Sequence, residues 1–118
     1  YALGINESQL GRIKVVYEHI MENFKKEVSI REIADKMNIS EAAFYKFIKK
    51  QTKKTYTQII NEFRINYASK LLMTSDQTIL EVCFESGYNN VSYFNRKFKE
   101  IMRQTPHEFR SNYLSRNS

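Results

Sequence analysis

The sequence predicts an all-α protein of about seven helices, and three observations support this fold class. Only three glycines and one proline occur among 118 residues, so little of the chain is suited to turns. Apolar residues recur at helical spacing, and alternating Val-rich runs that would predict strands are absent. Several segments begin with the S/T-x-x-E or S/T-x-x-Q pattern that caps a helix. A chain that is 42% hydrophobic should fold as one domain around a core.

The helices can be assigned in order from caps and periodicity. The first is expected to start weakly near Asn6 and to bury one apolar stripe. The stripe comprises Leu10, Ile13, Tyr17, Ile20 and Phe24. Ser29 with Glu32 and then Ser40 mark the second and third helices. Three further capping pairs follow: Thr55 with Gln58, Thr78 with Glu81, and Thr105 with Glu108. Asn90, before Phe94 and Phe98, is the N-cap expected for the sixth helix.

An internal repeat predicts the architecture. Residues 33–60 align with residues 82–109 when one extra residue is allowed in the second turn. Each copy has the pattern of a helix-turn-helix, which needs a small residue where its helices touch and a turn residue that tolerates positive φ. The small residues are Ala34 and Cys83, and the turn residues are Asn38 and Gly87. The predicted layout is a helix-turn-helix at about 29–52, a linker helix at about 55–74, a second helix-turn-helix at about 78–103, and a C-terminal helix at about 105–115.

Positive charge is concentrated in two segments. Residues 40–55 hold five lysines and one glutamate, a net charge of +4, and residues 90–103 hold four cations and one glutamate, a net charge of +3. Since the whole chain has a net charge of +6, the remaining residues sum to −1. A charge run is usually a solvated face, but two matched runs on a near-neutral chain are better explained by a polyanionic partner.

The second helix of each copy carries the candidate binding residues. In the first copy, the residues expected to point outward are Ala42, Tyr45, Lys46 and Lys49. In the second copy, they are Val91, Ser92, Tyr93, Asn95, Arg96 and Lys99, preceded by Asn90. Neither face is expected to mix acids with bases, and the first turn after Asn90 has no acid although a helix N-terminus favours one. Small and amide groups in front, with cations behind, suit a helix in the major groove of double-stranded DNA.

Other classes of function are less well supported. His19 and His107 belong to no catalytic or ligand motif, and neither a metal nor a cofactor is predicted. A basic helical module that binds RNA or a protein partner is the main alternative. Binding to a membrane surface is disfavoured, because the phenylalanines of the two basic segments are needed in the core. The lone Cys83 excludes an internal disulfide, and with no apolar run or signal peptide a cytoplasmic location is expected. The first residue, Tyr1, suggests a segment of a longer chain.

Three stretches of the sequence resemble the DNA-binding domain of the AraC/XylS family of bacterial transcription regulators. They are FRINYASKLL (63–72), ILEVCFESGYNNVSYFNRKFKE (79–100) and TPHEFR (105–110). The resemblance covers residues 29–113 and implies two homeodomain-like helix-turn-helix units. It implies double-stranded DNA and RNA polymerase as partners and a role in transcription as an activator, with a role as a repressor left open. It also implies a sensing or dimerising domain that this chain lacks. It places base-reading positions at Ala42, Tyr45 and Lys46, and at Val91, Ser92, Asn95 and Arg96.

Four cations need separate interpretation. Family members usually have glycine after each recognition helix, where this chain has Lys53 and Arg103. Either these residues adopt positive φ at some cost, or the helices end differently. Arg64 is interpreted as a structural cation that ties the linker helix to a neighbouring helix, with contact to the DNA backbone as the alternative. Arg110 is also interpreted as structural.

A linker helix of about 18 residues spans roughly 27 Å, which suits two adjacent major grooves.

Overall fold

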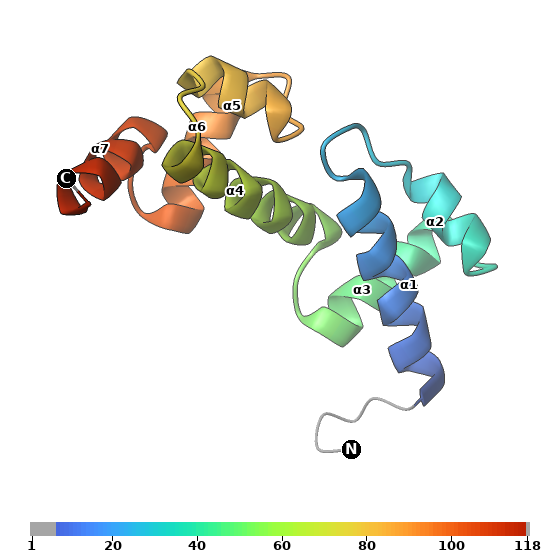
Figure 1. The fold of residues 1–118 in the computed structure, drawn as a ribbon. Coiled ribbons are helices and arrows are strands. Elements are labelled where there is room, and N and C mark those ends of the chain that lie inside the picture. The colour runs from blue at the N-terminus through green and yellow to red at the C-terminus, as the bar shows by residue number, and fades with distance from the viewer. Residues whose placement is uncertain (1–6, 118) are drawn as a thin grey trace. The chain divides into compact units, whose positions relative to one another are not determined.

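The computed structural model describes residues 7–117, which form seven α-helices and no strand (Figure 1). The helices are α1 (Glu7–Asn23), α2 (Ile30–Lys36), α3 (Glu41–Thr52), α4 (Tyr56–Thr74), α5 (Ile79–Glu85), α6 (Val91–Met102) and α7 (Pro106–Arg116). The predicted all-α fold class is therefore confirmed. Asn6, the expected cap of the first helix, lies outside the described residues.

The chain divides into two compact units, whereas one core was expected. The first unit contains the chain up to Asn23 and then Glu27–Ile60. The second contains Phe24–Lys26 and the chain from Asn61 onward. The helix α4 starts in the first unit and continues in the second as one uninterrupted helix (Figure 1). Each unit contains one of the two predicted helix-turn-helix motifs.

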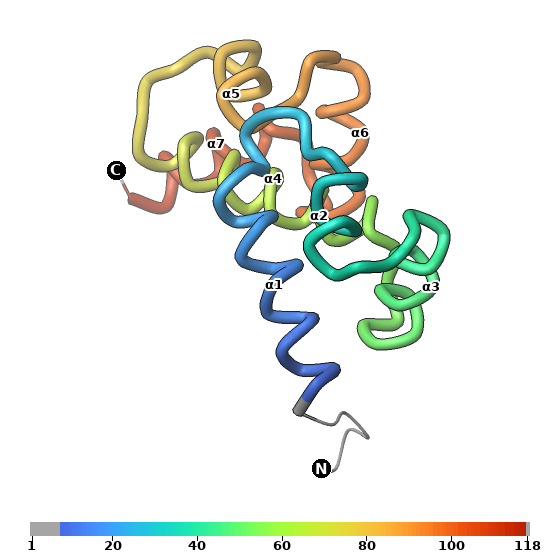
Figure 2. The backbone as a smooth tube through the Cα atoms, turned by 90° about the vertical axis from the view of Figure 1, so that its right-hand side faces the viewer, coloured from blue at the N-terminus to red at the C-terminus, as the bar shows by residue number. Residues whose placement is uncertain are grey.

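The first unit is built on α1, α2 and α3, and α2 packs against both of the other helices (Figure 2). Its buried apolar residues are Val16, Ile20, Ile33, Ala34, Met37, Phe44, Ile48, Tyr56, Ile59 and Ile60. The predicted stripe of α1 is wrong at both ends. Leu10 is 55% exposed, whereas Ile20 of the stripe is buried together with Val16, which the stripe did not include. Phe24 lies beyond the end of α1 and packs against Phe63 and Tyr67 in the second unit.

The second unit packs α6 against both α5 and α7. Its core consists of Ile65, Ala68, Leu72, Val82, Cys83, Tyr88, Phe94 and Phe98. Cys83 is fully buried, and this burial raises the pKa of its thiol. The interpretation of Cys83 as a small packed side chain is thus confirmed, and its raised pKa favours the protonated thiol.

The two tight turns confirm the repeat. Asn38 has a φ of 57° and Gly87 a φ of 100°, as the turn chemistry required. The backbone N–H that follows each turn residue donates to the carbonyl of the predicted small residue. These bonds run from Ile39 to Ala34 (3.0 Å) and from Tyr88 to Cys83 (3.1 Å). The two copies therefore share the hydrogen bonds of the turn as well as the spacing of their sequences.

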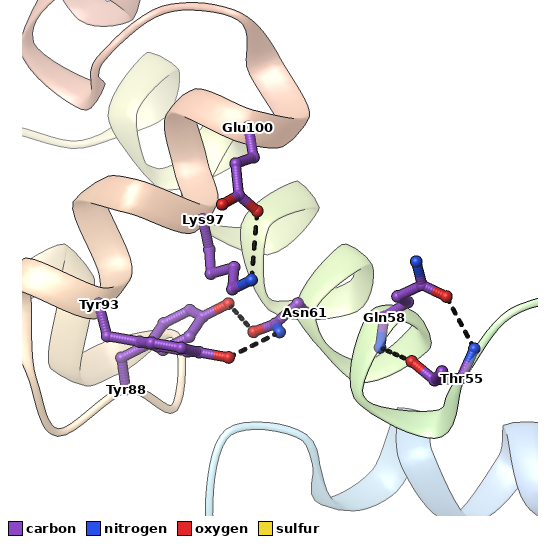
Figure 3. A network of polar contacts seen from close by, with 7 residues as sticks. All are labelled: Thr55, Gln58, Asn61, Tyr88, Tyr93, Lys97 and Glu100. Atoms are coloured by element: carbon purple, nitrogen blue, oxygen red, sulfur yellow. Dashed lines mark hydrogen bonds and ion pairs between the residues drawn. The ribbon is translucent and has the colours of Figure 1, made fainter.

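The caps mostly follow the sequence pattern. Thr78 and Thr105 form complete capping boxes with the glutamates three residues later. Thr55 and Gln58 exchange the same two bonds, at 2.8 and 3.1 Å (Figure 3). Ser29 accepts the N–H of Glu32 at 3.2 Å, but the reciprocal bond of a full box is not formed between these two residues. The start of α2 is therefore held by one capping bond.

Candidate nucleic-acid interface

The helix α6 exposes one face, the predicted reading face, and buries the opposite one. Phe94 and Phe98 are fully buried, and they fix the rotation of α6 about its axis. This rotation leaves six residues of α6 exposed: Val91, Ser92, Asn95, Arg96, Lys99 and Glu100. The first five are residues predicted from the sequence. Lys97 is half-buried, and its Nζ contacts Oε2 of the exposed Glu100 at 3.2 Å.

The N-terminal end of α6, which carries the partial positive charge of the helix dipole, has no acidic residue in its first turn. The exposed Asn90 is the N-cap, and its Oδ1 accepts the N–H of Tyr93 at 2.8 Å. The partial positive charge of the helix end and the cation of Arg96 therefore add to one another on this face. Such an arrangement favours an approaching phosphate.

Tyr93 departs from the predicted outward orientation. Its side chain is half-buried and packs against the core of the second unit. Its hydroxyl accepts a hydrogen bond from Asn61 Nδ2 at 3.1 Å, and its ring lies 5.9 Å from that of Tyr88. The buried Asn61 on α4 fixes this orientation, and no sequence motif indicated that residue.

The helix α3 presents the corresponding face in the first unit. Phe44 and Ile48 are fully buried, and Ala42, Tyr45, Lys46 and Lys49 are exposed as predicted. The expectation that this face has no acid is wrong, because Glu41 is exposed in the first turn. A carboxylate there stabilises the helix end but repels a phosphate. The two reading faces are therefore unequal in charge at their leading ends.

Both α3 and α6 end on a cation in the left-handed region. Lys53 has a φ of 63° and Arg103 a φ of 65°. Each backbone N–H donates to the carbonyl four residues earlier, at 3.0 and 2.9 Å. Of the two alternatives left open by the sequence, positive φ is thus the one adopted. Both side chains remain exposed.

Arg64 and Arg110 are structural, as predicted. Arg64 donates from Nε to the carbonyl of Phe24 (2.8 Å) and from Nη2 to that of Lys26 (3.0 Å). Its partner is thus the segment after α1, whereas a neighbouring helix was expected. Arg110 donates to the carbonyls of Leu72, Ser75 and Gln77 around the end of α4. Each guanidinium satisfies carbonyls at the point where the chain leaves a helix.

Metal and membrane sites were also considered. Within residues 7–117, His, Cys, Asp and Glu side chains form no group of three placed to hold a metal ion. The helices described here include none with the length and apolar content needed to cross a bilayer.

Comparison with known proteins places the chain in a family. The helix-turn-helix domain family matches residues 33–112. The virulence regulon transcriptional activator VirF of Shigella flexneri is 34% identical over 90 residues, which are 76% of this chain and 34% of that protein. This chain thus matches about a third of the length of that relative.

Solved structures share the fold. A DNA-binding transcriptional dual regulator from Escherichia coli K-12 is 26% identical with a TM-score of 0.75, covering 88% of this chain and 92% of that one. A probable AraC family transcriptional regulator from Rhodopseudomonas palustris has a TM-score of 0.81 at 18% identity, covering 87% and 97%. The chain therefore belongs to the helix-turn-helix domain family and is an AraC/XylS-type DNA-binding domain, as its motifs predicted.

Proposed function

We propose that this chain binds double-stranded DNA sequence-specifically through α3 and α6 and is the DNA-binding part of a bacterial transcription regulator. The observation that carries the proposal is the repeated reading face. In each unit the apolar side of the second helix is buried, and its exposed side carries cations behind small or amide side chains. This order places base-contacting groups near the groove floor and cations near the phosphates.

The helix α6 is proposed as the main reader. Arg96 suits guanine, and Asn95 suits adenine or a phosphate. Val91 offers an apolar contact to a thymine methyl, Ser92 can bond either kind of base edge, and Lys99 lies one turn behind to meet a phosphate. Asn90 remains a predicted DNA contact, through the part of its amide that the cap does not use.

The helix α3 is proposed as a weaker reader and an anchor. Lys46 suits guanine and Lys49 suits a phosphate, while Tyr45 is 48% exposed and can contact the sugar–phosphate backbone. Ala42 can offer only an apolar contact. Because Glu41 adds a negative charge to the first turn, we expect this helix to contribute less to sequence preference than α6.

The two helices are proposed to enter successive major grooves. The helix α4 has 19 residues, which correspond to roughly 28 Å at about 1.5 Å per residue. Successive grooves on one face of DNA are about 34 Å apart, so modest DNA bending would complete the fit. The DNA site is expected to be asymmetric, since the two faces differ.

Contact with RNA polymerase and activation of transcription belong to the same proposal. They are supported by the resemblance to the AraC/XylS family and by VirF, which is itself a transcriptional activator. Transcription in vitro from a promoter carrying a selected site, with and without this chain, would test them. A change in transcript yield from that promoter, and none from a promoter lacking the site, is the expected result.

The DNA-binding proposal is tested by selection and titration. DNA fragments selected by the chain from a random pool should share an asymmetric motif, and anisotropy titration should show a strong dependence on salt. Lys14 offers a matched control for charge, since it pairs with Glu18 on α1 at 3.8 Å. Lys14→Ala should leave the motif unchanged. Equal binding of duplex DNA and single-stranded RNA at moderate salt would refute sequence-specific reading.

A further inference from the structure

A buried amide connects α4 to α6 in the second unit (Figure 3). Asn61 on α4 is 4% exposed. Its Oδ1 accepts the hydroxyl of Tyr88 at 2.6 Å, and its Nδ2 donates to the hydroxyl of Tyr93 at 3.1 Å. Burial raises the pKa of Tyr88, so that hydroxyl stays protonated as the donor. Buried polar groups bonded in this way hold one arrangement, because any other leaves a group unsatisfied.

Tyr93 carries this connection to the reading face. Its ring packs against Tyr88 on the core side. The guanidinium carbon of Arg96 lies 5.3 Å from the centre of the same ring, and Lys97 Nζ lies 5.4 Å from it. Both distances are within the range of a cation–π contact. Arg96, the proposed guanine reader, therefore rests on a ring that a buried amide holds in place.

We propose that Asn61 is a positioning residue for DNA readout, which fixes Tyr93 and through it orients Arg96 before DNA is bound. The inference rests on the proposed function of α6. An arginine that is already held loses less rotamer freedom when it reaches a base. Tyr93 then acts as the support of a base reader, in place of the outward DNA contact expected from the sequence.

The repeat supplies an internal comparison. In the alignment of the two copies, Ala43 of α3 takes the place of Tyr93, and Lys46 takes the place of Arg96. Alanine offers no ring against which a cation can rest. Preorganisation of this kind is thus expected for Arg96 and not for Lys46. The preference for one base pair should therefore be stronger at the position that α6 contacts than at the position that α3 contacts.

The first experiment measures base preference. On a site selected by the wild-type chain, Arg96→Ala identifies the base pair that Arg96 reads. Asn61→Ala and Tyr93→Leu should each lower the preference at that pair on the order of fivefold, and Tyr93→Phe should lower it less because it keeps the ring. Affinity for non-specific DNA should not change, since none of these three variants removes a charge. Thr78→Ala is the matched control, because it loses a cap in the same unit without touching Tyr93.

The second experiment needs no DNA. NMR of the free chain should show the side-chain protons of Arg96 shifted upfield by the Tyr93 ring, and Asn61→Ala or Tyr93→Leu should move them toward exposed values. The inference is overturned if the wild-type shifts are those of a solvated arginine. It is also overturned if the variants lose stability but keep the base preference. Should the wild type select no site while the ring shift is present, the proposed function fails and the positioning of Arg96 stands.

Discussion

Replacing Gly87 by alanine should be among the most damaging single changes in the second unit. A methyl group there would lie 2.4 Å from the backbone oxygen of Phe24 and 2.9 Å from Arg64 Nε. The φ of 100° adds strain of about 1–3 kcal/mol for any L residue. Displacing Arg64 also weakens its bonds to the carbonyls of Phe24 and Lys26, where a charged hydrogen bond contributes about 1.5–3 kcal/mol. We therefore expect a loss of about 3–5 kcal/mol in the free energy of unfolding.

Urea unfolding followed by far-UV circular dichroism measures this loss, and amide hydrogen exchange localises it to α5 and α6. Gly11 is the matched control, because it lies within α1 and a methyl group there would meet no atom within 4 Å. Gly11→Ala should stabilise the chain by about 0.5–1 kcal/mol. A loss below about 1 kcal/mol for Gly87→Ala would refute the argument from close approach and strain.

Three further predictions concern binding, strain and pH. Arg96→Ala should weaken binding to a selected site by about 1–3 kcal/mol and relax one base position, whereas Lys49→Ala should weaken all sequences alike and lower the salt slope by about one unit. Anisotropy titrations in which the two variants behaved alike would contradict the assignment of Arg96 to base contact and Lys49 to phosphate contact. Arg103→Gly should change the free energy of unfolding by less than about 1 kcal/mol in urea titrations, because relief of strain is offset by lost charge and greater unfolded-state freedom. Cap hydrogen bonds from Thr105 hold the pKa of Glu108 below its usual value. The stabilisation of the folded chain by these bonds is therefore fully present above the pKa that Glu108 has in the unfolded chain, and it is lost as pH falls through the lower pKa of the folded chain. The first cause is the backbone N–H of Thr105, which donates to Glu108 Oε1 and which alanine retains, and the Thr105 hydroxyl is the second. In NMR titrations, Thr105→Ala should therefore raise that pKa only part of the way toward its usual value, and an unchanged pKa would show that the hydroxyl makes no contribution.

Local chemistry explains why most helices and both turns could be predicted. A cap such as Thr78 or Thr105 acts within four residues of itself, so its pattern is visible in the sequence. The positive φ of Asn38 and Gly87 followed from the tight turn that the repeat demanded. The exposed cations of α6 followed from the spacing of its buried phenylalanines.

The remaining features depend on contacts between distant parts of the chain. Asn61 and Tyr93 are 32 residues apart, and no periodicity or motif relates them. The helical pattern left Tyr93 at the edge of the reading face, and only packing against α4 shows that it turns inward. The α1 stripe was wrong at Leu10 for a similar reason, since this apolar residue is exposed and the spacing of apolar residues cannot show which of them another element covers.

The cations that end α3 and α6 show how strain and charge are balanced at the proposed interface. A non-glycine residue in the left-handed region costs roughly 1–2 kcal/mol, and both Lys53 and Arg103 accept that cost. A positive charge at a helix C-terminus recovers about 0.3–1 kcal/mol from the helix dipole. Glycine at either position would avoid the strain but would lose more freedom on folding and would carry no charge. The net penalty for each cation is therefore small, and the same solution at equivalent positions of both copies is what a polyanionic partner would favour.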